Sequence, residues 1–353
     1  MKNKKESRDS SIELLRLVLM LMICIHHCIV HGLGLQSLTG GTPDHVLLAE
    51  GQIIYADVLN SFCICAVNCF ILISGYYSIR TSARKIIFIL LTILFYSIPF
   101  NIIPAFMHAS DTGNWNEALL SLLFISRPPT YWFVADYLFL MILAPMLNLM
   151  FEKFSIRNVK LTLLGLLIIS CYFGFIWGHS ANNTGYTLMQ FILMYCIGRY
   201  INITNWELTK GKALLTYFIS SLLIATAMWT CQSAGKFGLS WRLTYYNDPL
   251  LILSAIALFI FFKNINFQSL FINNIAKSAF AVYLLESSTL ISDIVYMIVG
   301  QIVTQYNGMI FFIIPILSLI TLICAVIIDR LRQIVVNKLI SIFNQRLIIN
   351  EPG

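Results

Sequence analysis

The stretch "SSIELLRLVLMLMICIHHCIVHG", residues 10–32, decides the fold of the chain and raises its main chemical question. Its apolar length is close to the ~20 residues that a helix needs to cross a bilayer. The same stretch carries Glu13, Arg16, His26, His27 and His31. A charge near the bilayer centre costs at least ~2.5–3.5 kcal/mol, so polar groups inside a span usually face the protein interior and serve a function. We therefore expect a membrane helix with one functional face.

The rest of the chain has the composition of a membrane protein. Of its 353 residues, 58% are hydrophobic and only 11% are charged, and the mean hydropathy is +0.80. A soluble chain of this length needs more charge to cover its surface, and apolar runs this long exclude barrel strands. The sequence predicts an all-α, polytopic transmembrane helical bundle of about ten spans, at residues 11–32, 53–77, 85–106, 130–150, 160–178, 186–201, 211–231, 247–263, 275–299 and 307–329.

The basic residues predict the orientation of these spans. With a cytoplasmic N-terminus, 19 of the 23 Lys and Arg residues fall in inner segments and three fall in outer segments; the last, Arg16, lies inside the first span. This asymmetry places both termini in the cytoplasm, and its spread over many loops argues against a nucleic-acid partner. The basic N-terminus precedes a long span with no cleavage site, which we interpret as retained rather than as a signal peptide.

Two segments are expected not to cross. The segment 115–126 is too short and is expected to lie at the surface or to re-enter, and the tail 331–353 has the pattern of an amphipathic helix on the inner leaflet. We therefore predict one transmembrane domain, 1–330, followed by a cytoplasmic amphipathic tail, 331–353. The nine cysteines fall almost entirely within spans and are interpreted as core residues, since their spacing fits neither a disulfide framework nor a metal site.

Helix geometry groups the polar residues of the first span. Eleven residues turn a helix by three turns plus about 20°, so Arg16 and His27 share a face, ~16 Å apart along the axis. Glu13 and His31 extend the same stripe, which should line an interior cavity. His26 points elsewhere and is more typical of a packed or hydrogen-bonded core residue.

These residue types suit different tasks. His27 suits a general base, and Arg16 suits a phosphate or carboxylate ligand. An arginine at this depth can also reach the inner interface by snorkelling. His27 and His31 have metal-ligand spacing, but no third ligand is evident nearby, so no metal is predicted.

Other polar residues lie deep in later spans. Glu286 is near the centre of the ninth span, with Tyr283 one turn before it and Asp293 two turns beyond on the same helical face. A glutamate at this depth is expected to be functional, either neutralising Arg16 or bonding to His27.

Two further spans carry weaker candidates. Asp136, at the depth of His27, could orient that histidine or merely touch interfacial water. Tyr131 and Trp132 are candidate interface anchors, and Trp132 is also a candidate substrate contact. Asn68 and the Ser74-Gly75 pair fit either a site or close helix packing.

Taken together, these segments resemble the membrane-bound acyltransferase 3 family, in particular its branch that modifies bacterial surface polysaccharides. "SSIELLRLVLMLMICIHH" looks like the family's first-helix signature, in which an arginine precedes the key histidine by eleven residues. "VNCFILISGYYS", "YWFVADYLFLMILAPMLN", "FILMYCIGRYI" and "SAFAVYLLESS" resemble later motifs. The chain departs from that branch at Glu286, where a histidine is common.

The resemblance implies an O-acyltransferase that moves an acyl group, usually acetyl, from cytoplasmic acetyl-CoA to a hydroxyl of an extracytoplasmic carbohydrate or lipid-linked glycan. It implies a multi-pass protein of the bacterial inner membrane, without a metal. In this hypothesis Arg16 binds the donor, and His27 acts as base or as transient acyl acceptor. Glu286, Asp136 or Asp293 orients His27. Arg16, Asn68, Ser74 or Tyr283 supplies the oxyanion donor.

Two other functional classes of membrane protein also require buried charges and a cavity, or a polar membrane face. A transporter or flippase of a lipid-linked saccharide would leave an acyl-CoA thioester intact. A membrane sensor or scaffold would neither consume the thioester nor move a solute.

Overall fold

The computed structural model describes residues 9–40, 46–123, 131–306 and 309–349. Within these ranges the chain forms helices joined by loops, with no β-strand, which confirms the predicted all-α bundle. By length and composition, seven described helical segments can cross a membrane, or eight if one bent pair counts as a span. The basic residues at positions 2–8, Arg127 and the end of the 115–126 segment lie outside the described residues.

The helices follow one another in this order: α1 Ser10–His27, α2 Glu50–Cys63, α3 Ala66–Tyr76, α4 Ala83–Ser97, α5 Ile103–Thr112, α6 Trp115–Ser121, α7 Trp132–Lys153, α8 Ile156–Leu167, α9 Leu188–Thr204, α10 Lys210–Ser233, α11 Phe237–Arg242, α12 Pro249–Lys263, α13 Leu270–Ile275, α14 Ala279–Glu286, α15 Thr289–Gln305 and α16 Ile310–Ile349. Three π-helical segments continue these helices, at Cys28–Gly32, Ile98–Ile102 and Ile168–Ile176, and 3-10 turns occupy Leu35–Gly40 and Ala276–Ser278.

Polar side chains set where several helices begin. Asp9 precedes α1 and accepts a hydrogen bond from the backbone N–H of Ser11. Ser82, Ser155 and Thr187 cap α4, α8 and α9 in the same way. Asp248 caps α12, whose first residue is a proline that needs no hydrogen-bond partner. The apolar spans therefore start at defined residues, which fixes the depth of the side chains that follow.

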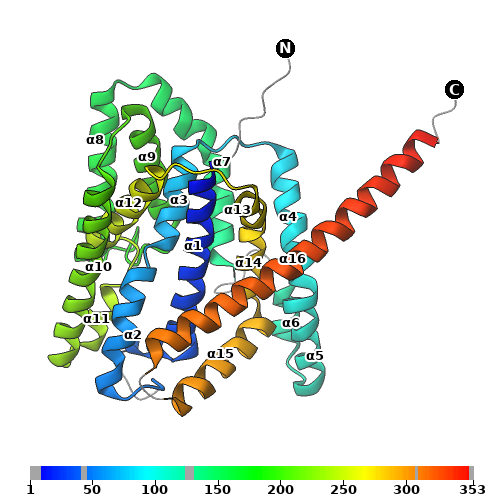
Figure 1. Cartoon of the computed structure of the whole chain (residues 1–353), viewed down its shortest axis with the longest axis horizontal. Coiled ribbons are helices and arrows are strands. Elements are labelled where there is room, and N and C mark those ends of the chain that lie inside the picture. Colours follow the sequence, from blue (N-terminus) through cyan, green and yellow to red (C-terminus); the bar gives the residue numbers. More distant parts are fainter. Residues whose placement is uncertain (1–8, 41–45, 124–130, 307–308, 350–353) are drawn as a thin grey trace.

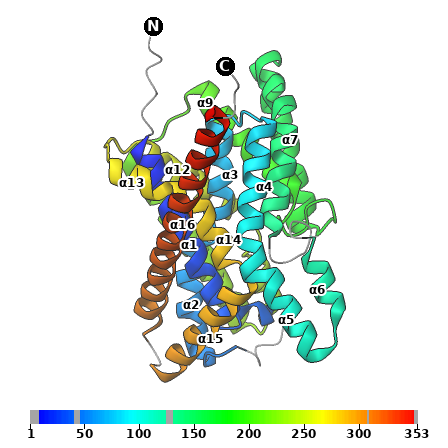
Figure 2. The ribbon, with the colours of Figure 1, turned by 90° about the vertical axis from the view of Figure 1, so that its right-hand side faces the viewer.

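Helix α1 lies in the centre of the bundle (Figures 1 and 2). Its most apolar window is 67% buried, and that of α2–α3 is 72% buried, whereas the other spans reach only 22–33%. The helices α2, α3, α12, α14 and α16 all pack against it. The polar residues of α1 therefore face protein rather than lipid, as the cost of a charge in hydrocarbon requires.

The close packing of α3 against α9 depends on two glycines. A Cβ added at Gly75 would lie 2.1 Å from the carbonyl oxygen of Tyr195, and one at Gly198 would lie 2.2 Å from that of Leu72. Only glycine permits this approach of the two backbones. The packing interpretation of the Ser74-Gly75 pair is therefore confirmed for Gly75.

The prediction of one straight span over residues 275–299 is wrong. Two helical segments, Leu270–Glu286 and α15, meet at an angle of 82°, and the break falls directly after Glu286. The helical phase that placed Asp293 on the face of Glu286 therefore does not apply. In Figure 1, α15 lies across the end of the bundle opposite the start of α1.

Two other segments, 115–126 and 331–353, are predicted not to cross the membrane. The segment that begins at Trp115 forms only the seven-residue helix α6, too short to cross. At the other end of the chain, α16 continues through residue 331 without a break and reaches Ile349. It runs diagonally across the bundle and extends beyond it (Figure 1).

Contacts between loops identify the two ends of the bundle. At one end, Ser10 bonds to Gln268, Tyr77 to Asp9, and Lys263 lies 3.9 Å from Glu207. These contacts bring together four segments that the sequence predicts to be cytoplasmic. The opposite end carries the loops around Gln36, Thr184 and Tyr245, and it is the predicted outer end.

Candidate active site

A cavity of about 1260 Å³ lies in the predicted outer half of the bundle. Its walls come from the end of α1, the α4–α5 junction, α7, the loops before α9 and α12, and the α14–α15 junction. They combine imidazoles, aromatic rings and polar groups, represented by His26, His27, His31, Asn101, His108, Tyr131, Trp132, Tyr186, Tyr246, Tyr283, Ser287, Asp293 and Tyr296. The mixture of rings with a few polar groups is typical of a binding site for an organic substrate.

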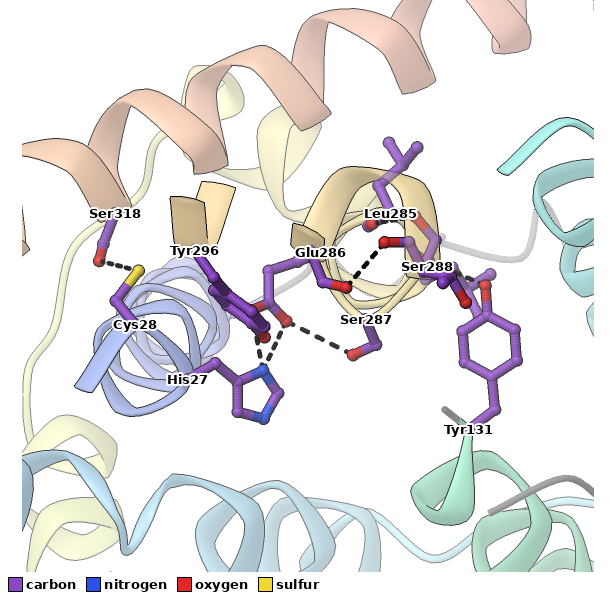
Figure 3. Close-up of polar contacts among 12 residues, drawn as sticks. His27, Cys28, Tyr131, Leu285, Glu286, Ser287, Ser288, Tyr296 and Ser318 are labelled. Atoms are coloured by element: carbon purple, nitrogen blue, oxygen red, sulfur yellow. Dashed lines mark hydrogen bonds and ion pairs between the residues drawn. The ribbon is translucent and has the colours of Figure 1, made fainter. Parts of the chain in front are cut away.

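His27 and Glu286 form the central pair of this cavity (Figure 3). The Nδ1 atom of His27 lies 2.7 Å from one carboxylate oxygen of Glu286 and 2.8 Å from the other. The side chain of Glu286 is 2% exposed and that of His27 is 19% exposed. The sequence left Arg16 and His27 as alternative partners of Glu286, and in the structure Glu286 contacts His27.

This contact determines which nitrogen of His27 can react. A carboxylate only accepts hydrogen bonds, so Nδ1 of the neutral ring carries the proton and Nε2 holds the lone pair. Figure 3 shows Nε2 directed away from Glu286. The pair therefore has the arrangement of a general base oriented by a carboxylate.

Glu286 has two further neighbours, one at the break and one in α15. The hydroxyl of Tyr296 lies 3.5 Å from one carboxylate oxygen, and that of Ser287 lies 3.4 Å from the other. Both distances are long for hydrogen bonds, so the short contact to His27 dominates. A helix ending at Glu286 thus presents its carboxylate toward α1.

The neighbouring histidines have different partners. His26 is buried and its Nδ1 lies 2.7 Å from Oδ1 of Asn60, which confirms its prediction as a hydrogen-bonded core residue. His31 lies on the π-helical turn after α1, and its Nδ1 atom lies 2.7 Å from the side-chain oxygen Oε1 of Gln36. Its ring centre is 5.5 Å from that of His27.

Three aromatic rings form one wall of the cavity. The ring centres of Trp132 and Tyr246 are 5.8 Å apart and nearly parallel, and Tyr186 lies 4.8 Å and 4.4 Å from these two rings. The backbone of Tyr246 donates to the carbonyl of Thr184, which ties the two loops together. We refer to Trp132, Tyr186 and Tyr246 as the aromatic wall.

Of the ten candidate site residues predicted from the sequence, His27, Trp132, Tyr283 and Asp293 line this cavity. A fifth, Glu286, is not itself a lining residue but contacts His27. The bent helix places Asp293 there by a route different from the one predicted.

Five others lie outside the residues that line it, namely Glu13, Arg16, Asn68, Ser74 and Asp136. Asn68 donates to the carbonyl of Tyr246 and accepts from Gln190, so it supports the aromatic wall from behind. Ser74 bonds within α3 and to Tyr137.

Arg16 lies nearer the predicted cytoplasmic end, where its guanidinium contacts Glu13 at 2.7 Å. Met20 and Ile23 follow it on the same side of α1 and are buried. These apolar side chains lie between Arg16 and His27 along α1, and Arg16 is not among the described residues that line the cavity around His27.

Several cavity residues escaped the sequence analysis. Asn101, Tyr186, Tyr246 and Tyr296 come from loops or from segments with no unusual pattern, and Tyr131 had been interpreted only as an interface anchor. A polar or aromatic residue at a span end is common in any membrane protein, so no local signal distinguished these.

Comparison with known proteins gives one match. The model of a family described as "Acyltransferase domain" matches residues 9–330, nearly the whole chain. No curated protein and no solved structure matches significantly.

Proposed function

The chain belongs to this acyltransferase family, the acyltransferase 3 family, and is an integral membrane acyltransferase; we propose that it moves an acetyl group from cytoplasmic acetyl-CoA to a hydroxyl of an extracytoplasmic carbohydrate. The observation that carries the proposal is the buried carboxylate of Glu286 held 2.7 Å from Nδ1 of a histidine that lines a large cavity. In this proposal the membrane is the cytoplasmic membrane of a bacterium.

The chemical step uses His27 as general base. Its Nε2 takes the proton of the acceptor hydroxyl while the hydroxyl oxygen bonds to the thioester carbonyl carbon. The carbon–sulfur bond then breaks, the proton passes from His27 to the departing sulfur, and the products are the ester and free coenzyme A. Glu286 stabilises the imidazolium that exists between the two proton transfers.

The outer half of the cavity suits a carbohydrate acceptor. The aromatic wall offers flat apolar faces, and the cavity lining also includes Ser292 and Asp293 as polar contacts. A sugar ring has the same division into apolar faces and a polar rim. The cavity volume of about 1260 Å³ exceeds the usual range for small-molecule pockets, which favours a saccharide over a smaller alcohol.

The donor is proposed to enter from the cytoplasmic end. Arg16 lies there, with a side chain that is 33% exposed, and its guanidinium can bind a phosphate group in a bidentate manner. The thioester must then pass Met20 and Ile23 to reach His27. Methionine is flexible enough to move aside.

The test compares His27→Ala with His179→Ala, a histidine that is not among the residues lining the cavity. Each variant is purified in nanodiscs and supplied with acetyl-CoA and with glycan isolated from a strain lacking the gene. We expect His27→Ala to abolish thiol release and the acetyl mass increase on the glycan, and His179→Ala to retain both. Arg16→Ala should raise the KM for acetyl-CoA while leaving the KM for glycan unchanged.

Two outcomes would contradict the proposal. Full activity of His27→Ala would remove the base from the mechanism. An intact thioester with glycan moved across the bilayer would identify a transporter instead.

A further inference from the structure

The break between α14 and α15 leaves backbone groups that a continuous helix would pair. In such a helix the carbonyls of Leu284 and Leu285 would accept from the N–H groups of Ser288 and Thr289. Ending α14 at Glu286 frees the carbonyl of Leu284 and the N–H of Thr289, whereas the carbonyl of Leu285 still accepts from the backbone N–H of Ser288 at 3.1 Å. Freed backbone groups within a membrane bundle need other partners, because an unpaired one costs free energy comparable to a lost hydrogen bond.

Side chains from distant segments supply these partners. The hydroxyl of Tyr131, at the start of α7, donates to the carbonyl of Leu284 at 2.9 Å, as Figure 3 shows. The Oδ1 atom of Asn101, in the α4–α5 junction, accepts from the backbone N–H of Thr289 at 2.7 Å. The hydroxyl of Ser288 donates a second hydrogen bond to the carbonyl of Leu285 at 2.6 Å.

Tyr131 and Asn101 also bond to each other. The amide nitrogen of Asn101 donates to the hydroxyl of Tyr131 at 2.9 Å. One connected chain of hydrogen bonds therefore holds both sides of the break, with Glu286 between them. Tyr131 is 2% exposed and is fixed by this chain.

We propose that Tyr131 and Asn101 are positioning residues for the reaction: they clamp the α14–α15 break and thereby hold the Glu286 carboxylate against His27. Neither residue touches His27 or Glu286 in the described contacts, so their effect acts through the backbone. The proposal rests on the function proposed above, because it assigns these residues to the same catalytic pair.

The first test is Tyr131→Phe, assayed with acetyl-CoA and glycan as before. We expect kcat to fall about tenfold, the loss expected for one hydrogen bond, with the KM for both substrates within about twofold. A residue that contacts substrate would instead raise a KM. Asn101→Ala should give a similar fall, and it leaves the bond from Tyr131 to Leu284 in place should the tyrosine variant fold poorly.

The matched control is Tyr217→Phe. The hydroxyl of Tyr217 donates at 2.6 Å to the carbonyl of Phe62, near the junction of α2 and α3 and away from the cavity. This variant loses the same kind of bond beside another helix junction. We expect a comparable loss of thermal stability and an unchanged kcat.

The decisive measurement repeats Tyr131→Phe in a Glu286→Gln background. If the clamp acts through Glu286, its removal should cost less than about twofold there, because interacting residues are not additive. A full tenfold fall in that background, an unchanged kcat in the single variants, or a raised KM would overturn the proposal. Loss of activity in His27→Ala alongside an unaffected Tyr131→Phe would refute only the clamp, whereas an active His27→Ala would refute the proposed function.

Discussion

Replacing Glu286 by glutamine tests the catalytic pair with little change in shape. Glutamine keeps an oxygen that can accept from Nδ1 of His27, but it removes the negative charge that stabilises an imidazolium. The two carboxylate oxygens lie 2.7 and 2.8 Å from Nδ1, so the charge centres of the protonated pair are about 4 Å apart.

The expected magnitude follows from that separation. At an effective dielectric constant of ~20, two unit charges about 4 Å apart attract by about 4 kcal/mol. Since 1.36 kcal/mol corresponds to a factor of ten in rate, kcat should fall about a thousandfold. In the proposed mechanism His27 is neutral before the proton transfer, so the binding constants of both substrates should change little.

The assay measures thiol release from acetyl-CoA with glycan from the deletion strain as acceptor, in nanodiscs at matched protein amounts. The control is Glu207→Gln, which removes a carboxylate that is 73% exposed and lies at the predicted cytoplasmic end. That variant should keep wild-type kcat. A Glu286→Gln enzyme within tenfold of wild type would refute the idea that this charge stabilises the protonated base.

Two further variants, with one control, probe the aromatic wall and the packing of α9 against α3. Trp132→Ala should raise the KM for glycan about tenfold and leave the KM for acetyl-CoA unchanged, because one aromatic contact of the acceptor is lost; equal effects on both constants would contradict this role. Gly198→Ala should destabilise the fold by at least about 1–3 kcal/mol, because its new methyl group would meet the Leu72 carbonyl at 2.2 Å. Gly211→Ala, whose Cβ would meet no atom within 4 Å, should leave the melting temperature unchanged.

The general architecture was predictable because membrane insertion leaves a strong trace in sequence. Long apolar runs predicted most helices at the observed places, although seven described segments, or eight with the bent pair, can cross a membrane where about ten spans are predicted. The charge cost of a bilayer indicated that the polar face of α1 is turned inward. The same cost singled out Glu286, a carboxylate predicted near the centre of a span, and the structure places it against His27. These inferences succeed because each depends on one residue and its depth.

The relation between Arg16 and His27 was predicted less completely. Helical phase correctly puts both on one stripe of α1, but phase says nothing about what fills the space between them. Met20 and Ile23 lie there and are buried. Apolar residues at these positions are typical of any membrane span, so they gave no signal. A cavity depends on side chains from several helices, so the periodicity of a single helix cannot establish its extent.

The break after Glu286 shows the same limit in a sharper form. The segment "AFAVYLLESSTLISDIVYMIVG" contains no proline, and its only glycine, Gly300, lies 14 residues after Glu286, so local propensity favours a continuous helix. The hydrogen-bond partners that stabilise the 82° bend come from Asn101 and Tyr131, more than 150 residues away in the chain.

In a continuous helix, Glu286 would lie in the middle of a regularly hydrogen-bonded segment. The bend instead makes Glu286 the last residue of α14 and lets α15 return Tyr296 to within 3.5 Å of the carboxylate. Sequence depth therefore identified the carboxylate that we propose to orient the base, whereas its orientation toward His27 depends on tertiary hydrogen bonds that no local pattern encodes.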